Sequence, residues 1–311
     1  MDVGGTKLAI RAESDHHEPY ETAVRWPEGG PAADLRVLED QIDLLRRQWG
    51  GSIRSIGIAL PATLDDRGRV VTWPGRPSWA GVDLGRWVQA LFPGLPVAYA
   101  DDGGLAALAE AEASGSRDLL YVGVGTGVGG GMILEGRPTP HPDVGSFEIG
   151  HIIVDRFGAV CDCGRRGCVQ ATASGPAVLR RAEQLRGAPV TFDGLLRGLE
   201  GREAWAQSAV NDGAAALAVS VTTVAELLRP SRVLIGGGFA AGVQSYVDAV
   251  ASFVTELSRP GQQVPSVGPA RLGGLSSLYG AVLIARRTRS PASENQAGAG
   301  ATHRSATLRG R

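Results

Sequence analysis

The sequence has little lysine: of its 31 basic residues only Lys7 is a lysine, and the others are arginine. The 32 acidic residues balance them, which leaves a formal net charge of −1. Such a balance argues against a protein that holds a nucleic-acid backbone with a basic face. It also gives no support for a basic helix on a membrane surface. We therefore expect neither nucleic acid nor membrane as a partner.

Long apolar runs and a secretion signal are missing as well. No apolar run reaches the roughly 18 residues that a transmembrane helix needs. Asp2, Gly4 and Gly5 stand where a signal peptide would need a basic and then an apolar segment. We therefore expect a cytoplasmic globular protein. Its 311 residues, 43% of them hydrophobic, suffice for one large domain or two lobes.

Cysteine is scarce and clustered, because all three cysteines, Cys161, Cys163 and Cys168, fall within one short segment. An odd, clustered set is a poor disulfide framework and a plausible metal site. With His151 they form a Cys3His set, which suits tetrahedral zinc in a structural role. The alternative is that the three cysteines are small buried hydrophobic residues.

Short β-branched runs alternate with segments of helical spacing, such as Leu35, Leu38, Ile42 and Leu45, and this mixture predicts an α/β fold. The predicted strands cover residues 8–11, 55–60, 97–100, 119–123, 129–134, 152–154 and 232–235. The predicted helices cover residues 33–48, 84–91, 104–114, 176–185, 204–228, 244–257 and 278–287. Residues 289–311 are poor in aliphatic side chains and are predicted to form a disordered tail.

Glycine is concentrated in three clusters, here called the first (residues 2–7), second (123–131) and third (235–240) glycine loops. Glycine lets backbone N–H groups converge on phosphate oxygens, so three clusters favour a nucleotide site over ordinary turns. None of the loops matches a Walker or a dinucleotide-binding motif. The Gly4-Gly5 turn within the first loop comes after only three residues, so either the first strand is very short or the natural chain begins further upstream.

The glycine loops, the Glu-Ile-Gly-His run at 148–151 and the cysteine cluster together resemble the ROK family of sugar kinases and repressors. The resemblance extends from Asp2 to about Arg287. It implies the two-lobed actin-like ATPase (ribonuclease H-like) fold, closing on ATP and sugar. The small lobe would contain residues 1–108 and a returning helix at 276–288, and the large lobe residues 109–275 with the zinc site. Many relatives are dimers or tetramers, so a homodimer or homotetramer is expected.

The resemblance also implies roles for single residues. Asp102 would be the catalytic base, just before a helix at Gly104 whose positive end would keep it ionised; the alternative is an ordinary helix N-cap. Glu148 and His151 would contact the sugar, and Asp2 would hold Mg²⁺. The nucleotide and its phosphates would lie against Asp2, Gly4, Gly5, Thr6, Lys7, Gly125, Thr126, Gly127, Gly236, Gly237 and Gly238.

Three positions depart from the family pattern on the acceptor side. Asp101 replaces an Asn, Gln170 a sugar-binding Glu, and Gly75 an Asn near the sugar. An ionised Asp only accepts hydrogen bonds, whereas Asn also donates, and Gln gains a donor that Glu lacks. We therefore expect an altered acceptor pocket that disfavours plain glucose, with a C7-cyclitol bearing a hydroxymethyl group as one candidate acceptor.

The predicted activity is transfer of the γ-phosphoryl group of ATP to a primary hydroxyl of a hexose or hexose-like polyol. A plain glucokinase and an N-acyl-aminosugar kinase remain open. Two alternatives belong to other classes: a repressor, which needs a winged-helix domain before the first glycine loop, and a non-catalytic sugar sensor. A zinc-binding interaction module would leave the glycine loops unexplained.

Overall fold

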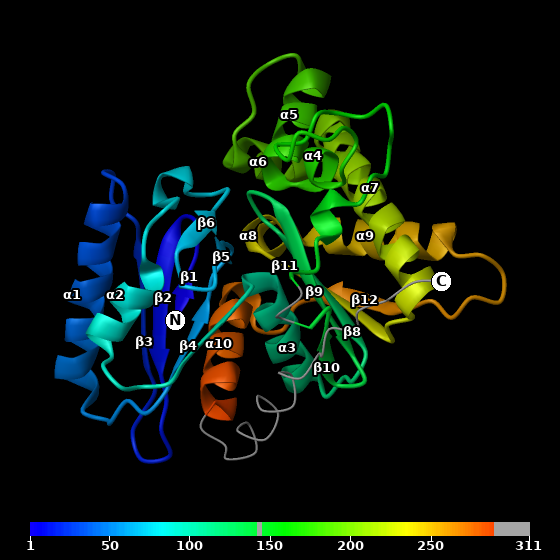
Figure 1. Cartoon of the computed structure of the whole chain (residues 1–311). Helices are drawn as coiled ribbons and strands as arrows, with labels where there is room; N and C mark the ends of the chain where they lie inside the picture. Colours follow the sequence, from blue (N-terminus) through cyan, green and yellow to red (C-terminus); the bar gives the residue numbers. More distant parts are fainter. Residues whose placement is uncertain (142–144, 289–311) are drawn as a thin grey trace, which may run out of the picture.

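The computed structural model describes residues 1–141 and 145–288, which build two five-stranded sheets (Figure 1). The first sheet has the order β3-β2-β1-β4-β7 and the second β10-β9-β8-β11-β12. The first consists of β1 (Asp2–Val3), β2 (Lys7–Ala12), β3 (Tyr20–Arg25), β4 (Ile56–Ala59) and β7 (Val97–Ala100). The second consists of β8 (Leu119–Val124), β9 (Val128–Leu134), β10 (Arg137–Thr139), β11 (Arg232–Gly236) and β12 (Ser266–Pro269).

The two sheets have the same pairing pattern. Each begins with a three-stranded antiparallel meander. A later strand then pairs in parallel with the first strand of the meander, and a last strand pairs in parallel with that added strand. A separate hairpin pairs β5 (Thr63–Leu64) with β6 (Val70–Thr72). The repeated pattern is the α/β arrangement that the sequence predicts.

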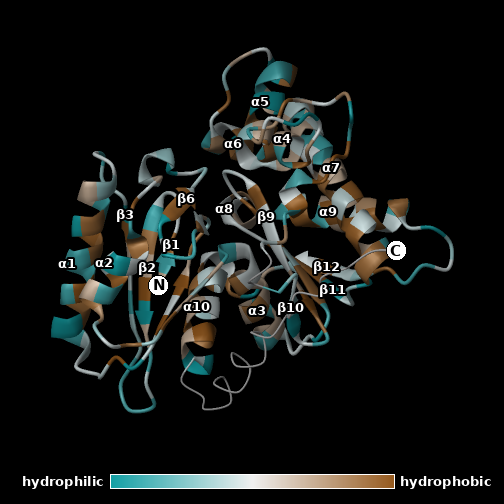
Figure 2. Ribbon diagram, in the orientation of Figure 1, coloured by the Kyte–Doolittle hydropathy of each residue, from teal (hydrophilic) through white to brown (hydrophobic). Residues whose placement is uncertain are grey.

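Ten α-helices occur in the described part of the chain, with three short 3₁₀ segments. The α-helices are α1 (Pro31–Trp49), α2 (Leu84–Leu91), α3 (Asp102–Ser114), α4 (Gln170–Ala173), α5 (Gly175–Arg186), α6 (Phe192–Glu200), α7 (Ala204–Leu228), α8 (Gly238–Gly242), α9 (Gln244–Leu257) and α10 (Ser276–Arg287). The 3₁₀ segments are η1 (Pro77–Trp79), η2 (Ile149–His151) and η3 (Gly273–Leu275). Hydrophobic residues concentrate on the strands, and the solvent sides of α1 and α5 are hydrophilic (Figure 2).

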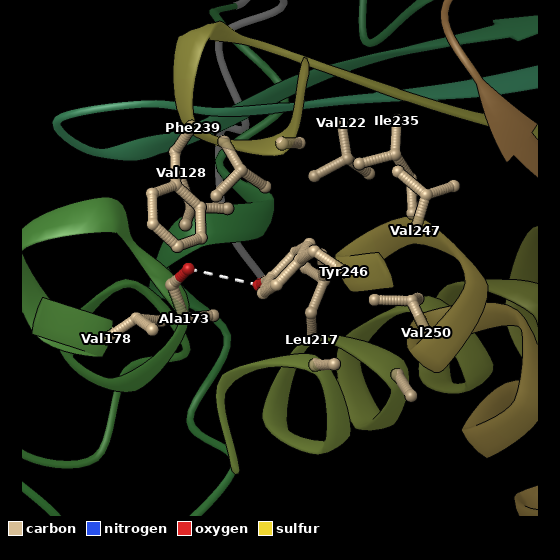
Figure 3. Close-up of a cluster of buried hydrophobic side chains, with 14 of the residues drawn as sticks. Val122, Val128, Ala173, Val178, Leu217, Ile235, Phe239, Tyr246, Val247 and Val250 are labelled. Carbon is tan, nitrogen blue, oxygen red and sulfur yellow. Dashed lines mark hydrogen bonds between the residues drawn. The ribbon is translucent and has the colours of Figure 1, made fainter. Parts of the chain in front are cut away.

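Each sheet has its own hydrophobic core. Around the second sheet, β8, β11, α7 and α9 enclose Tyr246, whose hydroxyl donates to the carbonyl of Ala173 at 3.0 Å (Figure 3). Around the first sheet, Leu8 and Ile58 pack with the fully buried Trp79. A third buried cluster lies between the two halves and joins Ala59 of β4 to Leu119 of β8 through residues of α3 and α10.

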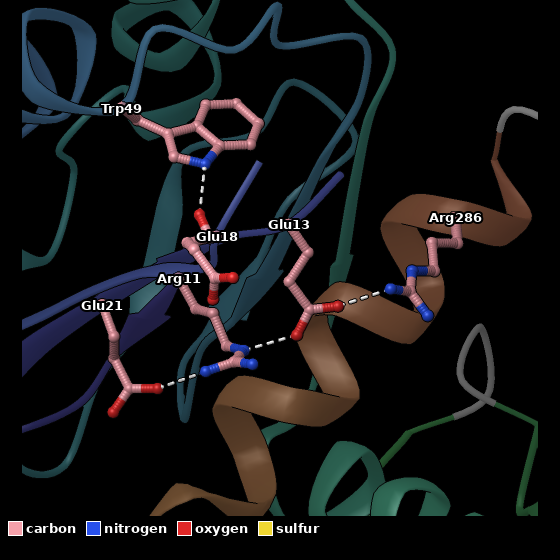
Figure 4. A network of polar contacts seen from close by, with 6 residues as sticks. All are labelled: Arg11, Glu13, Glu18, Glu21, Trp49 and Arg286. Carbon is pink, nitrogen blue, oxygen red and sulfur yellow. Dashed lines mark hydrogen bonds and ion pairs between the residues drawn. The ribbon is translucent and has the colours of Figure 1, made fainter. Parts of the chain in front are cut away.

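Helix α10 connects the two halves, because it packs against β4 of the first sheet and against α3. A side chain on Gly280 would lie 2.1 Å from the carbonyl oxygen of Leu105, so only glycine permits this helix crossing. Near the end of α10, Arg286 pairs with Glu13, which also pairs with Arg11 (Figure 4). Residues 276–287 therefore form a helix on the first sheet, and the assignment of residues 276–288 to the small lobe stays a prediction. The lobe boundary at residue 108 falls inside α3 and stays a prediction.

Most predicted elements are found, some with their predicted bounds, as for α2, α7, α9 and β7. The predicted strand at 152–154 is wrong: its one ladder contact is an isolated bridge between Ile153 and Cys168, because this segment is bent around the cysteine cluster. The predicted tail, 289–311, lies outside the described residues. Among the described residues, no helix is long and apolar enough to cross a bilayer.

Candidate active site

The first glycine loop is the turn between β1 and β2. The amide of Gly4 donates to the carbonyl of Lys7 at 3.0 Å, which closes the turn. Asp2, on β1 just before the turn, is 7% exposed and accepts a hydrogen bond of 2.7 Å from the hydroxyl of Ser277 in α10. Burial raises the pKa of Asp2 above its ordinary value, while that hydrogen bond opposes the shift. A buried carboxylate of this kind suits a bound cation.

The second and third glycine loops lie together at one end of the second sheet. Residues 125–127 join β8 to β9, and Gly237 joins the last residue of β11, Gly236, to the first residue of α8, Gly238. Gly237 has φ +88°, and a side chain there would lie 2.4 Å from the carbonyl oxygen of Val124. A side-chain carbon on Gly125 would lie 3.9 Å from the amide nitrogen of Gly238. The structure thus brings two of the three predicted loops into contact, although they are over 100 residues apart in the chain.

Asp101 and Asp102 stand at the start of α3. Asp101 is the N-cap, and its Oδ2 accepts from the amide of Gly104 at 3.0 Å. Asp102 is the first helical residue, and its Oδ1 accepts from the amide of Gly103 at 2.8 Å. The expectation that Asp102 precedes a helix beginning at Gly104 is therefore wrong by two residues. The N-cap role considered for Asp102 belongs to Asp101.

The protonation of this pair also differs from the expectation. Burial raises the pKa of Asp102 to about 7, and the charges of Asp101 and Asp2 add to the shift. The amide of Gly103 acts in the opposite direction but does not overcome burial. The helix terminus therefore does not keep Asp102 firmly ionised. Burial also raises the pKa of Asp101, against the opposing hydrogen bond from Gly104. A carboxyl with a pKa near 7 is well matched to accept a proton at neutral pH.

The predicted metal ligands converge. One ligand atom from each of His151, Cys161, Cys163 and Cys168 lies within 4.8 Å of every other. Cys163 Sγ and Cys168 Sγ are 3.7 Å apart, and Cys161 Sγ is 3.8 Å from His151 Nδ1. Tetrahedral zinc with bonds of about 2.3 Å places its sulfur ligands roughly 3.8 Å apart. The cluster is therefore compatible with a structural zinc ion.

His151 connects this cluster to Glu148. Its Nδ1 faces the cysteines, whereas its Nε2 lies 3.9 Å from Glu148 Oε2. Glu148 is exposed, and its Oε1 accepts a hydrogen bond of 2.5 Å from the hydroxyl of Ser146. The Glu148 charge also contributes to the raised pKa of Asp101, which places both carboxylates on one wall of the site.

The other two departures lie beside the glycine loops. Gln170 Oε1 accepts from the amide of Val128 at 3.1 Å, and its Nε2 lies 4.0 Å from Cys161 Sγ. A side chain on Gly75 would lie 3.4 Å from the Cα atom of Gly5. Contact of Gln170 and Gly75 with an acceptor stays a prediction, because the contacts seen are on the glycine-loop side.

A cavity of about 980 Å³ opens beside Asp101, between α3, β9, β10 and the segment that precedes Glu148. Its wall includes Asp101, Gly131 and Phe147. Asp102 is absent from the described lining. The volume is ample for a small ligand. Of the predicted acceptor residues, only Asp101 belongs to its described wall, so use of this cavity by the acceptor stays a prediction.

The sequence prediction missed two side chains that contact the first glycine loop. Trp26 Nε1 donates to the carbonyl of Gly4 at 2.6 Å, and Arg76 Nη1 donates to that of Gly5 at 3.3 Å. Both come from outside the glycine-rich segments. The available signal was weak: Arg76 is the charged residue of a tryptophan- and proline-rich run at 73–79.

Comparison with known proteins agrees with this architecture. The sequence model of the ROK family matches residues 1–288. The chain is 52% identical over 286 residues to a kanosamine kinase of Amycolatopsis mediterranei (strain S699), covering 92% of this chain and 94% of the relative.

Two solved structures show the same fold. One is a ROK hexokinase from Thermus thermophilus, with TM-score 0.78, 29% identity and coverage of 92% and 96% of the two chains. The other is a ROK glucokinase from Streptomyces griseus in complex with glucose and AMPPNP, with TM-score 0.74, 25% identity and coverage of 92% and 98%. These relatives support an enzyme rather than a repressor or a sugar sensor, and an ATP-dependent sugar kinase implies ATP and Mg²⁺. The chain belongs to the ROK family, and it is a sugar phosphotransferase of the actin-like ATPase fold.

Proposed function

We propose that the acceptor is an aminohexose, phosphorylated by ATP on its primary hydroxyl. The observation that carries the proposal is the carboxylate of Asp101 at the N-cap of α3, directly beside Asp102. A carboxylate only accepts hydrogen bonds, and an ammonium group only donates them. A protonated amine on the acceptor therefore matches Asp101 better than a hydroxyl does.

The charges around Asp101 support the same choice. Burial is the main cause of the raised pKa of Asp101 and of Asp102, and neighbouring charges add to both shifts: Glu148 to that of Asp101, and Asp101 and Asp2 to that of Asp102. A cationic acceptor reduces this repulsion, whereas glucose and N-acylated sugars do not. A relative whose name is kanosamine kinase acts on an amino derivative of glucose, which agrees with this reading.

The proposed reaction begins with proton removal by Asp102. As the acceptor oxygen forms its bond to the γ-phosphorus, its proton passes to the Asp102 carboxylate, and the bond to the ADP oxygen breaks. The amides of Gly5 and Thr6 in the first glycine loop, together with residues 125–127, would hold the phosphates, and residues 236–238 would border the adenosine. Asp2 would hold Mg²⁺, which neutralises charge on the phosphates when bound.

The zinc cluster has a structural part in this proposal. His151 would be held by zinc through Nδ1 while its Nε2 faces the acceptor side near Glu148. Fixing one nitrogen of the ring sets the orientation of the other. Assembly as a homodimer or homotetramer remains a separate proposal that size measurement in solution would test.

The test is an acceptor panel with ATP and Mg²⁺: kanosamine, glucosamine, glucose, N-acetylmannosamine and a hydroxymethyl C7-cyclitol. Because a hydrogen bond to a charged group contributes about 1.5–3 kcal/mol, kcat/KM for kanosamine should exceed that for glucose by roughly tenfold to a hundredfold. Glucosamine separates the position of the amine from its charge. Preference for glucose, for the N-acylated sugar or for the neutral cyclitol would contradict the aminohexose proposal.

A further inference from the structure

We infer that Trp26 and Arg76 are positioning residues that aim the first glycine loop at the phosphates of ATP. The inference rests on the proposed function, because it takes residues 4–7 as a phosphate-binding loop. Its starting observation is that consecutive carbonyls of this loop are bound by donors from the first half of the chain. Trp26 Nε1 binds Gly4 O at 2.6 Å, Arg76 Nη1 binds Gly5 O at 3.3 Å, and the amide of Trp26 binds Thr6 O at 3.2 Å.

Peptide planarity gives these contacts a consequence. In a trans peptide the C=O of one residue and the N–H of the next point in opposite directions. Fixing the carbonyls of Gly4 and Gly5 therefore directs the N–H groups of Gly5 and Thr6 away from Trp26 and Arg76. Within the described parts of the chain, neither of these N–H groups donates to another backbone carbonyl. Two oriented, unpaired amides are the donors that a phosphate site needs.

Arg76 can hold its carbonyl because the guanidinium is itself anchored. Its Nη2 pairs with Asp34, a fully buried carboxylate that also accepts from Trp79 Nε1 at 2.8 Å. The guanidinium lies 5.4 Å from the centre of the Trp26 ring. Arg76 thus bridges the carbonyl of Gly5 and the carboxylate of Asp34 and also lies over the Trp26 ring. Only the planar, forked arginine side chain offers this geometry.

The position of Trp26 and Arg76 indicates a role in the binding of ATP rather than of the acceptor. Gly75 precedes Arg76 and lies against Gly5, so the backbone of residues 75–76 packs directly behind the loop. The described side-chain contacts of Trp26 and Arg76 are with the loop, with Asp34, with the Trp79 ring at 6.3 Å from the Trp26 ring, and with each other. A change in either should therefore alter ATP binding and leave acceptor binding unaffected.

Two conservative variants test this inference. Trp26→Phe keeps an aromatic ring but removes the donor to Gly4 O. Arg76→Lys keeps a positive charge beside Asp34, so the buried carboxylate stays paired, but an ammonium lacks the fork that also reaches Gly5 O. Trp49→Phe is the matched control, because Trp49 Nε1 donates to the carbonyl of Glu18 at 3.1 Å in the same half of the chain, away from the loop.

The readouts are KM for ATP, KM for kanosamine, and the dissociation constant of a non-hydrolysable ATP analogue measured by calorimetry. One net hydrogen bond corresponds to roughly a threefold to tenfold change. For Trp26→Phe and Arg76→Lys we expect a roughly threefold to tenfold rise in KM for ATP and in the dissociation constant of the analogue, with KM for kanosamine within twofold of the wild type. For Trp49→Phe we expect no change in the constants for ATP or for kanosamine.

The outcomes separate this inference from the proposed function. A wild type that turns over with ATP, combined with unchanged ATP constants in both variants, would overturn the positioning role alone. A wild type without ATP-dependent transfer would instead contradict the proposed function. If Trp26→Phe unfolds, Arg76→Lys decides, with circular dichroism confirming that it is folded. A parallel rise in both KM values would also overturn the inference, since it would indicate general disruption.

Discussion

The part of the site predicted to bind ATP, here called the donor side, and the part predicted to bind the sugar, here called the acceptor side, are built in different ways. On the donor side, neutral or paired side chains fix backbone carbonyls, as Trp26 does for Gly4 and Arg76 for Gly5. On the acceptor side, Asp101, Asp102 and Glu148 are held close enough to repel one another. The first arrangement leaves the amides of Gly5 and Thr6 without a backbone acceptor among the described residues, so it suits an anion, whereas the second is relieved by a cation. Acceptor choice can therefore change through charge alone while the donor geometry is kept.

The largest expected effect is at the point where both sides meet. Asp102→Asn removes the proposed proton acceptor and should lower kcat by about a thousandfold, because general-base catalysis contributes roughly 10²–10⁴. Steady-state assays with kanosamine and ATP measure it. Retained turnover would remove Asp102 as the base.

The same substitution should lower activity but raise the stability of the folded protein at high pH. The pKa of Asp102 is raised to about 7, so the folded protein resists its ionisation, and stability is lost as pH rises from about 4 through 7. Asp102→Asn should therefore have a higher Tm than the wild type at pH 8, and the difference should shrink towards pH 4. The stabilisation at pH 8 is at most roughly 4 kcal/mol. Equal Tm values across this range would contradict the buried-carboxylate interpretation.

Removal of zinc should affect the binding of both ATP and the acceptor. The cluster reaches Glu148 through His151, and Cys161 lies beside Gln170, which in turn binds the amide of Val128 next to the second glycine loop. We expect one zinc per chain by atomic absorption, and a strong chelator should lower Tm and reduce kcat/KM by more than tenfold. A structural zinc contributes about 10 kcal/mol to local folding. Restoration by added zinc is the control. Full stability and activity in a metal-free protein would exclude this role.

The dependence of kcat/KM on pH tests whether Asp101 and Asp102 interact. The free enzyme needs Asp102 ionised, so kcat/KM should fall tenfold per unit as pH drops below about 7. Asp101→Asn removes a repelling charge, and its acid limb should move to lower pH. Asp83→Asn is the matched control, since Asp83 caps α2 through the amide of Arg86 at 3.0 Å. An acid limb that Asp101→Asn leaves in place would show that the two carboxyls are not coupled.

The smallest effect is expected at Lys7. It is half-buried in the first glycine loop, where a cation can meet ATP. Lys7→Ala should raise KM for ATP about threefold, and Lys7→Arg should restore it, because the surface-type charge interaction is worth less than about 1 kcal/mol. Unchanged ATP affinity in both variants would assign the lysine no role.

Local patterns predicted much of the fold. The bounds of α2, α7 and α9 follow from helical spacing between clear breaks. The three glycine loops were predicted to form a nucleotide site because glycine lets backbone N–H groups converge on phosphate oxygens. The edge strand β3 was missed, because its Tyr-Glu-Thr-Ala-Val-Arg sequence alternates half-buried and exposed residues and has no fully buried one. Helix α6 was also missed, although Thr191 caps it by accepting from the amide of Gly194.

Long-range contacts were harder to predict than local ones. Trp26 and Arg76 reach the first glycine loop only after the chain folds, and no spacing in the sequence links them. Gly75 and Gln170 were assigned to the acceptor from the resemblance, whereas their contacts lie against Gly5 and Val128. The raised pKa of Asp102 depends on burial, which the helix-start argument did not include.

The most direct test of the central claim is the ratio of kcat/KM for kanosamine to kcat/KM for glucose, measured in the wild type and in Asp101→Asn. An Asn at this position can still cap α3, so the change removes charge while keeping the hydrogen bond to Gly104. The aminohexose proposal predicts that the ratio favours kanosamine in the wild type and falls at least tenfold in the variant. A ratio that stays the same in both proteins would contradict it.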